Sequence, residues 1–373
     1  MNSTKLSRLL NFWRADKNNI SLISEICSLC CQLGDEQTFN QFQSDLNKQI
    51  AMSPGITYVL AWSHIKLNQI DQAKTLFESL PVEEDGKRIH GIATAQYLSS
   101  QFEQSLASIE SHSKDDLISP NLSVLAARCQ YQLGQLESAR DRLLAVKTLD
   151  QALESERLGL LAMLSFDLQI VDQASVFAKQ ALQISEHNHD ALLAAASVET
   201  YQTQFSAALS LIQKGTQLFP GSGRFWLLDA QIQLLQSDID SAYASAIKAA
   251  TIMPEHIGSW HLKAWVELLK HDYAEAHASF ETATELNRNF ADSHAGKGIT
   301  AFYLGQREAA EKHVKVALKL DPQCVTGLYA TSLFAGDDGD VSNSKKIVES
   351  ILNQPSHLAS DISYLKILER LKK

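Results

Sequence analysis

The sequence predicts an all-α solenoid, an array of helix-turn-helix repeats that share one continuous core. The chain has 373 residues, more than one ordinary hydrophobic core accommodates. It has only 16 Gly and 7 Pro, too few for the many tight turns of a sandwich or barrel. Similar residues recur 34 positions apart, the spacing of a stacked repeat.

The repeat is clearest in the second half of the chain. Trp226 and Ala230 recur at Trp260 and Ala264, 34 residues later. Seven of the nine intervals between successive repeat starts are 34 residues, and the other two are 32 and 35. The ten predicted repeat starts are Ile20, Pro54, Gly86, Pro120, Ser155, His189, Gly223, Ile257, Ala291 and Val325.

Two positions in each repeat hold small residues, which predicts two closely packed helices per repeat. The twentieth position is small in nine repeats, with Phe39 as the exception. Antiparallel helices approach closely only where a side chain is absent or very short. In the ninth repeat we expect helices over 292–304 and 307–320, with Gly305 at the turn. The eighth position is small in all ten repeats: Cys27, Ala61, Ala93, Ala127, Ala162, Ala196, Ala230, Ala264, Gly298 and Ser332.

Acidic residues open many of the predicted second helices, where they suit the exposed amides and the positive end of the helix dipole. These residues are Asp71, Glu103, Glu137, Asp172, Asp240 and Glu308.

The domain organisation that follows is one array with a cap at each end, because a stack must cover its outermost apolar faces. We expect an N-terminal capping segment over 1–19, with Leu9, Leu10, Phe12 and Trp13 as its apolar residues. The repeat array occupies 20–355. A C-terminal capping helix over 356–373 would present Ile362, Leu365, Leu368 and Leu371 on one side.

The pattern resembles the tetratricopeptide repeat (TPR) family over about residues 20–352. The resemblance departs at the seventh position, usually apolar, which holds Asp229, Lys263 and Lys297. It implies a right-handed superhelix whose first helices line a concave groove. The matching residues are Trp226, Ala230, Ala242, Ala249 and Pro254, then Trp260, Ala264, Tyr273, Ala276, Phe280 and Ala283.

The same resemblance assigns the groove to positions 2, 5, 9, 12 and 13 of each repeat. Aromatic residues there would give buried area to a bound peptide, and isolated charges would orient it. For Tyr131, Phe166, Trp265 and Phe302 the alternative is packing within the array, and for Arg128 and Arg224 it is a solvated surface. The candidate groove residues are Tyr58, Trp62, His90, Tyr97, Arg128, Tyr131, Phe166, Tyr201, Arg224, His261, Trp265, Phe302 and Tyr329.

The sequence offers no pattern for catalysis, a cofactor or a metal. Cys27, Cys30 and Cys31 lack a second cysteine pair for zinc, so we interpret them as buried small residues. The run 336–340 is acidic but lacks the ligand alternation of a calcium loop, so it is interpreted as a turn. We find no phosphate-binding loop and no hydrolase motif. No catalytic residue, cofactor or metal ligand is assigned.

The function we expect is a non-catalytic scaffold that binds a protein or peptide partner in the groove. The net charge of −10 disfavours binding to nucleic acid. The chain has no run of 18 uncharged apolar residues, so we do not expect membrane insertion. Free cysteines without a signal peptide favour the cytoplasm. The alternatives are a regulatory array that senses a small ligand or peptide, and an enzyme with an unrecognised site. Homo-oligomerisation is compatible with either kind of array.

Overall fold

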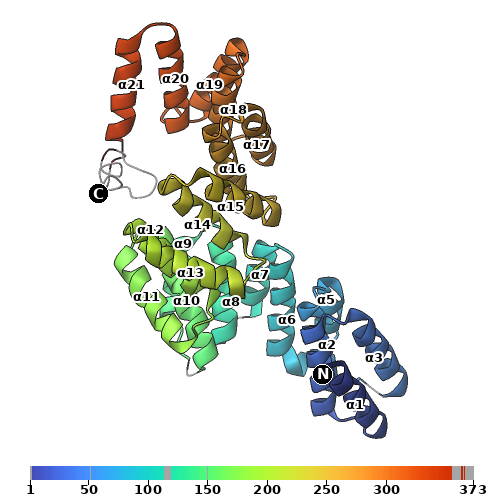
Figure 1. Cartoon of the computed structure of the whole chain (residues 1–373). Helices are drawn as coiled ribbons and strands as arrows, with labels where there is room; N and C mark the ends of the chain where they lie inside the picture. Colours follow the sequence, from blue (N-terminus) through green and yellow to red (C-terminus); the bar gives the residue numbers. More distant parts are fainter. Residues whose placement is uncertain are drawn as a thin grey trace. The chain divides into compact units, whose positions relative to one another are not determined.

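The computed structural model describes residues 2–50, 52–112, 119–148, 150–354, 363 and 365. α-Helices follow one another along these ranges, with one short 3-10 helix, Val82–Glu84 (Figure 1). The all-α prediction is therefore confirmed. The predicted capping helix over 356–373 lies outside the described residues, apart from Ser363 and Leu365.

The chain divides into two compact units, Met1–Arg157 and Leu158–Lys373, and the boundary falls within α10. The first unit contains α1 (Asn2–Ala15), α2 (Ile20–Leu33), α3 (Glu36–Gln49), α4 (Pro54–Lys66), α5 (Ile70–Glu78), α6 (Asp85–Leu98), α7 (Phe102–His112), α8 (Pro120–Gln132), α9 (Leu136–Ala145) and the start of α10 (Gln151–Asp167). The second contains the rest of α10 and α11 (Val171–Ile184), α12 (His189–Tyr201), α13 (Phe205–Leu218), α14 (Gly223–Leu235), α15 (Ile239–Ile252), α16 (Ile257–Leu269), α17 (Tyr273–Leu286), α18 (Ala291–Tyr303), α19 (Arg307–Leu320), α20 (Val325–Asp337) and α21 (Val341–Asn353).

The even-numbered helices from α2 to α20 are the first helices of the repeats, and the odd-numbered helices from α3 to α21 are the second helices. Eight of the ten first helices begin at the predicted start of their repeat; the first helix of the ninth repeat, expected over 292–304, is one of them and spans Ala291–Tyr303. The exceptions are α6, which begins one residue early at Asp85, and α10, which begins four residues early at Gln151. The early start of α10 has a local cause, since the Asp150 carboxylate accepts a hydrogen bond from the Leu153 amide at 3.0 Å and caps the helix.

The small residues lie where the two helices of a repeat meet. Every residue at the eighth position is buried. A side chain on Gly298 would place its Cβ 2.5 Å from Val314 Cγ2 and 3.1 Å from the Ala310 carbonyl oxygen. Where the twentieth residue is serine, its hydroxyl uses this proximity: Ser105 donates to the Ala93 carbonyl at 2.7 Å. Ser344 makes the equivalent bond to residue 332 at 2.8 Å.

Each first helix ends in a turn of one conformation. The fifteenth residue of every repeat has a positive φ, between 58° and 83°, whatever its side chain. The amide of the next residue bonds back to the carbonyl five residues earlier, as in Gln69 to His64 at 2.8 Å. This is the hydrogen bond that closes a helix with a left-handed residue. Glycine fills the position in four repeats (Gly34, Gly134, Gly305 and Gly339), and other residues fill it in six (Asn68, Ser100, Gln169, Thr203, Ser237 and His271).

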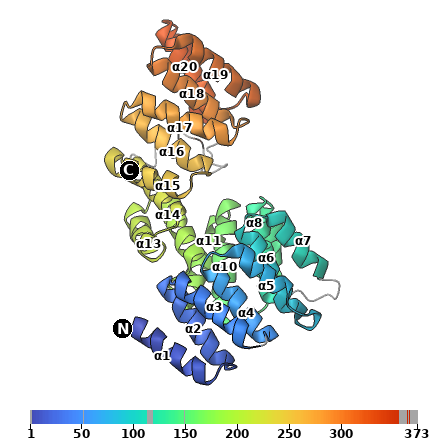
Figure 2. The ribbon, with the colours of Figure 1, turned by 90° about the vertical axis from the view of Figure 1, so that its right-hand side faces the viewer.

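Successive first helices contact one another within each unit. In the first unit α2 contacts α4, α4 contacts α6 and α6 contacts α8. In the second unit the contacts run from α12 through α14, α16 and α18 to α20, and Figure 2 shows α14, α16, α18 and α20 in this succession. Most second helices contact both their own first helix and the next one, as α5 contacts α4 and α6. Side chains from successive first helices therefore share one face in each unit, here called the first-helix face.

The N-terminal helix α1 packs onto the array through part of the expected apolar set. Leu9 and Trp13 are buried together with Leu6, and the Trp13 and Phe42 rings meet edge to face with centroids 5.0 Å apart. Phe12 is 63% exposed, because it lies on the opposite side of the same helix. Helix α1 thus packs on the first repeat with one face only.

The polar residues at the seventh position pair within or between the helices. The Ser245 hydroxyl donates to the Asp229 carboxylate. Lys263 bonds Glu267 at 2.6 Å and Ser279 at 2.8 Å, and Glu267, only 1% exposed, also accepts from Ser279 at 2.7 Å. These contacts provide hydrogen-bond partners for the polar side chains at the seventh position, which an apolar residue there would not need.

Candidate functional site

In the first unit, the first-helix face brings three of the predicted groove residues together. The Tyr58 and Trp62 rings on α4 lie 6.1 Å apart, and the Trp62 ring lies 5.4 Å from His90 on α6. The ring of Phe77 on α5 is fully buried and packs edge-on against the Tyr58 and Trp62 rings. All three groove residues are half-buried.

The chemistry of this cluster is aromatic and neutral. Burial lowers the pKa of His90, and the nearby Glu156 carboxylate opposes that shift. The Trp62 Nε1 atom is buried and has no hydrogen-bond partner among the described residues. The Lys87 ammonium lies 5.7 Å from the centre of the Tyr58 ring.

The other first-unit candidates lie apart from this cluster. The Tyr97 ring packs against Phe102 at 5.4 Å, at the far end of α6. Arg128 on α8 forms an ion pair with Glu156 at 2.9 Å. Tyr131 is half-buried one turn further along α8.

In the second unit, the candidates divide between packing and exposure. His261 Nε2 lies 2.7 Å from the Ser293 hydroxyl, and burial lowers the pKa of His261 to about 4. His261 and Trp265 both pack edge-on against Phe280, at 5.4 and 5.8 Å. Phe166 and Tyr201 are half-buried, whereas Arg224 is exposed.

The last candidate, Tyr329, belongs to a row of tyrosines whose other members, Tyr273 and Tyr303, were not among the candidates. Phe302 packs against Phe334 at 5.4 Å, and the Arg307 guanidinium lies over both rings. Tyr329 is 38% exposed and hydrogen-bonds to Tyr303, which stacks on Tyr273 with centroids 4.8 Å apart. Tyr303 occupies the thirteenth position of its repeat, one of the groove positions, so the signal was present in the sequence.

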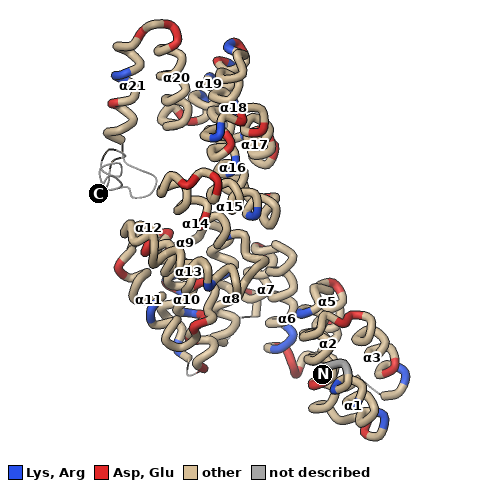
Figure 3. Tube along the Cα trace, viewed as in Figure 1, with Lys and Arg blue, Asp and Glu red and all other residues tan. Residues whose placement is uncertain are grey.

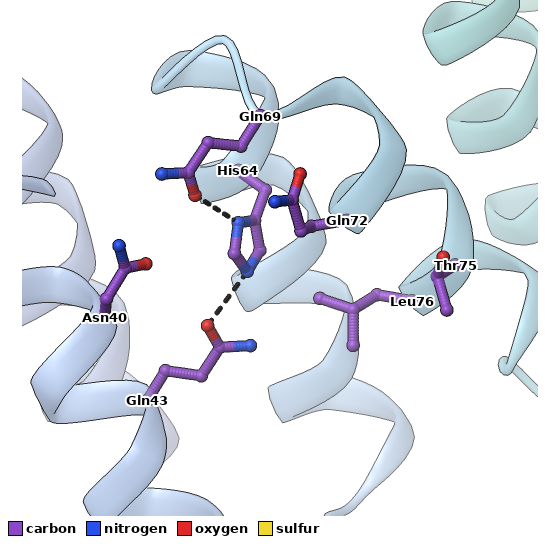
Figure 4. Close-up of a pocket in the computed structure, with 7 residues that line it drawn as sticks. All are labelled: Asn40, Gln43, His64, Gln69, Gln72, Thr75 and Leu76. Carbon is purple, nitrogen blue, oxygen red and sulfur yellow. Dashed lines mark hydrogen bonds between the residues drawn. The ribbon is translucent and has the colours of Figure 1, made fainter.

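A pocket of about 460 Å³ lies in the first unit, between second helices α3 and α5 and the end of α4 (Figure 4). Sequence reasoning did not find it. We call it the amide pocket, because four carboxamide side chains line it together with a histidine, a hydroxyl and one leucine: Asn40, Gln43, His64, Gln69, Gln72, Thr75 and Leu76.

The acidic run 336–340 comprises the last two residues of α20 and the turn that leads to α21, so most of it is the turn interpreted from the sequence (Figure 3). Arg307 from the preceding repeat contacts Asp337 at 3.1 Å and Asp338 at 2.8 Å. No group of three or more potential ligand residues that could hold a metal occurs in the described part of the chain. Among the same residues, no helix is both long and apolar enough to cross a membrane.

No protein-family model matches the chain. No curated protein matches it in sequence either. Solved structures do match in fold. A human IFIT1 dimer with m7Gppp-AAAA has a TM-score of 0.55 at 14% identity and covers 86% of this chain and 83% of its own.

A second match is the APC/C hetero-tetramer Cut9-Hcn1, with a TM-score of 0.50, 15% identity, and coverage of 89% of this chain and 72% of that one. YrrB, described as a TPR protein with an unusual peptide-binding site, has a TM-score of 0.39 at 18% identity and covers 47% of this chain and 90% of its own. At these identities the likeness to the IFIT1 and Cut9-Hcn1 structures shows the fold alone. The chain has the TPR-like all-α fold that its sequence resembles.

Proposed function

We propose that the chain is a non-catalytic protein-interaction scaffold that binds a peptide segment of a partner along the first-helix face. The observation that carries this proposal is the cluster of Tyr58, Trp62 and His90 in the first unit. These residues come from two successive first helices, contact one another, and remain half-exposed over a buried phenylalanine.

Such a cluster suits peptide binding for a physical reason. Rings already held by neighbours lose little conformational freedom on binding, so most of the buried area contributes to affinity. The nearby ions are largely paired within the chain, as Arg128 is with Glu156, so the surface favours apolar and aromatic anchors in the partner.

The test compares affinity capture by the full chain with capture by a Tyr58→Ala, His90→Ala double variant, read by mass spectrometry. Phe12→Ala is the matched control, because it removes an exposed ring from outside the cluster. A partner that depends on this face should be lost from the double variant and retained by the control. Its isolated peptide should then bind the double variant at least tenfold more weakly, about 1.4 kcal/mol.

Two outcomes would contradict the proposal. One is a partner set that is unchanged in the double variant, and the other is equal loss in the double variant and in Phe12→Ala. Thermal unfolding of all three proteins shows whether the loss reflects binding or folding. The IFIT1 structure contains m7Gppp-AAAA, so a capped oligonucleotide belongs among the probes. The expectation that this chain binds no nucleic acid predicts no effect from it.

A further inference from the structure

The amide pocket lies where two positions of the second repeat differ from those of three other repeats. At the eleventh position, Gln96, Gln130 and Glu267 each accept a hydrogen bond from the twenty-third residue of their own repeat. The donors are Ser108 at 2.9 Å, Arg142 at 2.9 Å and Ser279 at 2.7 Å. In the second repeat the corresponding residues are His64 and Leu76, and leucine has no group to donate.

His64 therefore bonds to other partners. Its Nδ1 lies 2.6 Å from Gln69 Oε1, and its Nε2 lies 3.0 Å from Gln43 Oε1 (Figure 4). His64 is only 3% exposed, and its burial lowers its pKa, although the bond to Gln69 opposes this shift. The ring is therefore neutral at neutral pH and carries a single proton.

The position of that proton follows from Gln69. The Gln69 amide nitrogen donates to Glu36 at 3.2 Å, so its oxygen must face His64 and accept from Nδ1–H. His64 Nε2 is then an acceptor. Gln43 must turn its NH₂ group toward Nε2 and its carbonyl oxygen into the pocket, since oxygen and nitrogen of a carboxamide exchange places by a half-turn.

The remaining lining side chains are uncharged. Asn40 and Gln72 make no hydrogen bond to any residue that the structure describes, so both carboxamides are available. Leu76 reaches from α5 toward Gln43 and His64 (Figure 4). No Lys, Arg, Asp or Glu lines the pocket.

The comparable space between α7 and α9 is filled by an ion. There Arg142 bonds both Gln130 and Glu110, at 2.9 and 3.1 Å, and spans the two second helices. The lining of the amide pocket contains no charged side chain that spans the two second helices in this way.

We propose that the amide pocket binds a neutral ligand group that both donates and accepts hydrogen bonds, which is a carboxamide or a peptide bond. Gln43 supplies an acceptor held in place by His64, while Asn40 and Gln72 supply donors and acceptors across the opening. A carboxylate or an ammonium would lose hydration without meeting an opposite charge, so the pocket should reject both. A volume of about 460 Å³ accommodates such a group with its neighbouring atoms.

The experiment titrates the ¹⁵N-labelled full chain with three small probes and follows the side-chain NH₂ signals of Gln43 and Gln72 by NMR. Propionamide represents a primary carboxamide, N-methylacetamide represents a peptide bond, and propionate is the charged match of propionamide. We expect saturable shifts with at least one amide and binding at least tenfold weaker for propionate. The amide that binds with the higher affinity shows whether the natural ligand group is a side-chain carboxamide or a backbone peptide bond.

A variant pair locates the site. Gln72→Leu should weaken the better amide about fivefold to tenfold, the effect of one or two lost neutral hydrogen bonds. Gln37→Leu removes an exposed carboxamide from α3 outside the pocket and should leave binding unchanged. Both sites are exposed, so both variants should unfold at the wild-type temperature.

Three results would overturn the proposal: no saturable shift with either amide, propionate binding less than tenfold weaker than the better amide, or equal effects of the two variants. The site uses second helices, so its failure leaves the first-helix proposal untouched.

Discussion

Thr203 is the least favourable of the ten turn residues. It holds a φ of 60°, where a β-branched side chain is strained against its own backbone. Glycine adopts this conformation freely but also gains freedom in the unfolded chain. We therefore expect Thr203→Gly to raise the free energy of unfolding by about 1 kcal/mol. Urea unfolding of the full chain measures the change.

Gly305 provides the reverse control, because it occupies the same position with a φ of 75°. Gly305→Ala should lower the free energy of unfolding by about 1 kcal/mol, since the new Cβ meets open space but the backbone becomes strained. Equal and small effects from both substitutions would mean that the turn relaxes away from the left-handed conformation.

At this scale the sequence predicted steric roles better than polar ones. The small eighth residues were assigned to helix contacts because size acts locally and repeats at a fixed place. His64 gave no such signal, since its role depends on Leu76, Gln43 and Gln69, which meet it only after folding. In the row of Tyr273, Tyr303 and Tyr329, only Tyr329 was predicted, although Tyr303 also occupies a groove position; Tyr273 lies outside those positions, so its contact with Tyr303 appears only in the fold.

Between helices, the buried group of Lys263, Glu267 and Ser279 provides a sharp test. The Glu267 side chain is 1% exposed, and the Lys263 ammonium at 2.6 Å is its counter-ion. Lys263→Met would leave that charge buried without a counter-ion and should lower the stability of the second unit by about 3 kcal/mol. Chemical unfolding followed by Trp fluorescence would record it.

The double variant Lys263→Met, Glu267→Gln separates charge from packing. It removes both ions while keeping similar volumes, and it should recover most of the lost stability. A double variant as unstable as the single one would assign the effect to packing.

Helix positions themselves were largely predictable, because starts and turns depend on local residues. The shifted start of α10 was missed because its cap, Asp150, lies before the repeat rather than in phase with it.

Over the whole molecule, burial of histidine makes stability depend on pH. Burial lowers the pKa of His261 to about 4, so the unfolded chain binds a proton that the folded chain refuses between about pH 6.5 and 4. Stability should therefore fall as the pH is lowered through this range. The shift has the same direction and the same main cause in two histidines of the first unit (His64 and His90) and three others of the second (His256, His277 and His313).

Because four of these six described histidines belong to the second unit, we expect that unit to lose more stability between pH 6.5 and 4. Hydrogen exchange read by mass spectrometry resolves the two units in the full chain. His261→Gln should flatten the pH dependence of the second unit alone. A slope unchanged by this substitution would show that His261 is not buried as a neutral ring.

The division into two compact units was not visible in the sequence. The boundary after Arg157 lies inside α10, close to the repeat start Ser155 that follows the one 35-residue interval, but the repeats continue past it and the helix is unbroken. Where cooperativity changes along an array depends on how well each interface packs, which is a property of many contacts together. The periodicity therefore predicted the architecture of the repeat and left the subdivision of the array open.

The constant left-handed turn has a consequence for engineering. It lies at the fifteenth position in every repeat. In the two repeats of irregular length, 32 and 35 residues, the difference in length therefore falls after this turn. A tag or reporter inserted at an exposed junction between repeats, such as Gly221, should leave every helix pair in register. The same insertion beside Gly305 should separate the two helices of one repeat, and the disruption should reach no further than the neighbouring repeats.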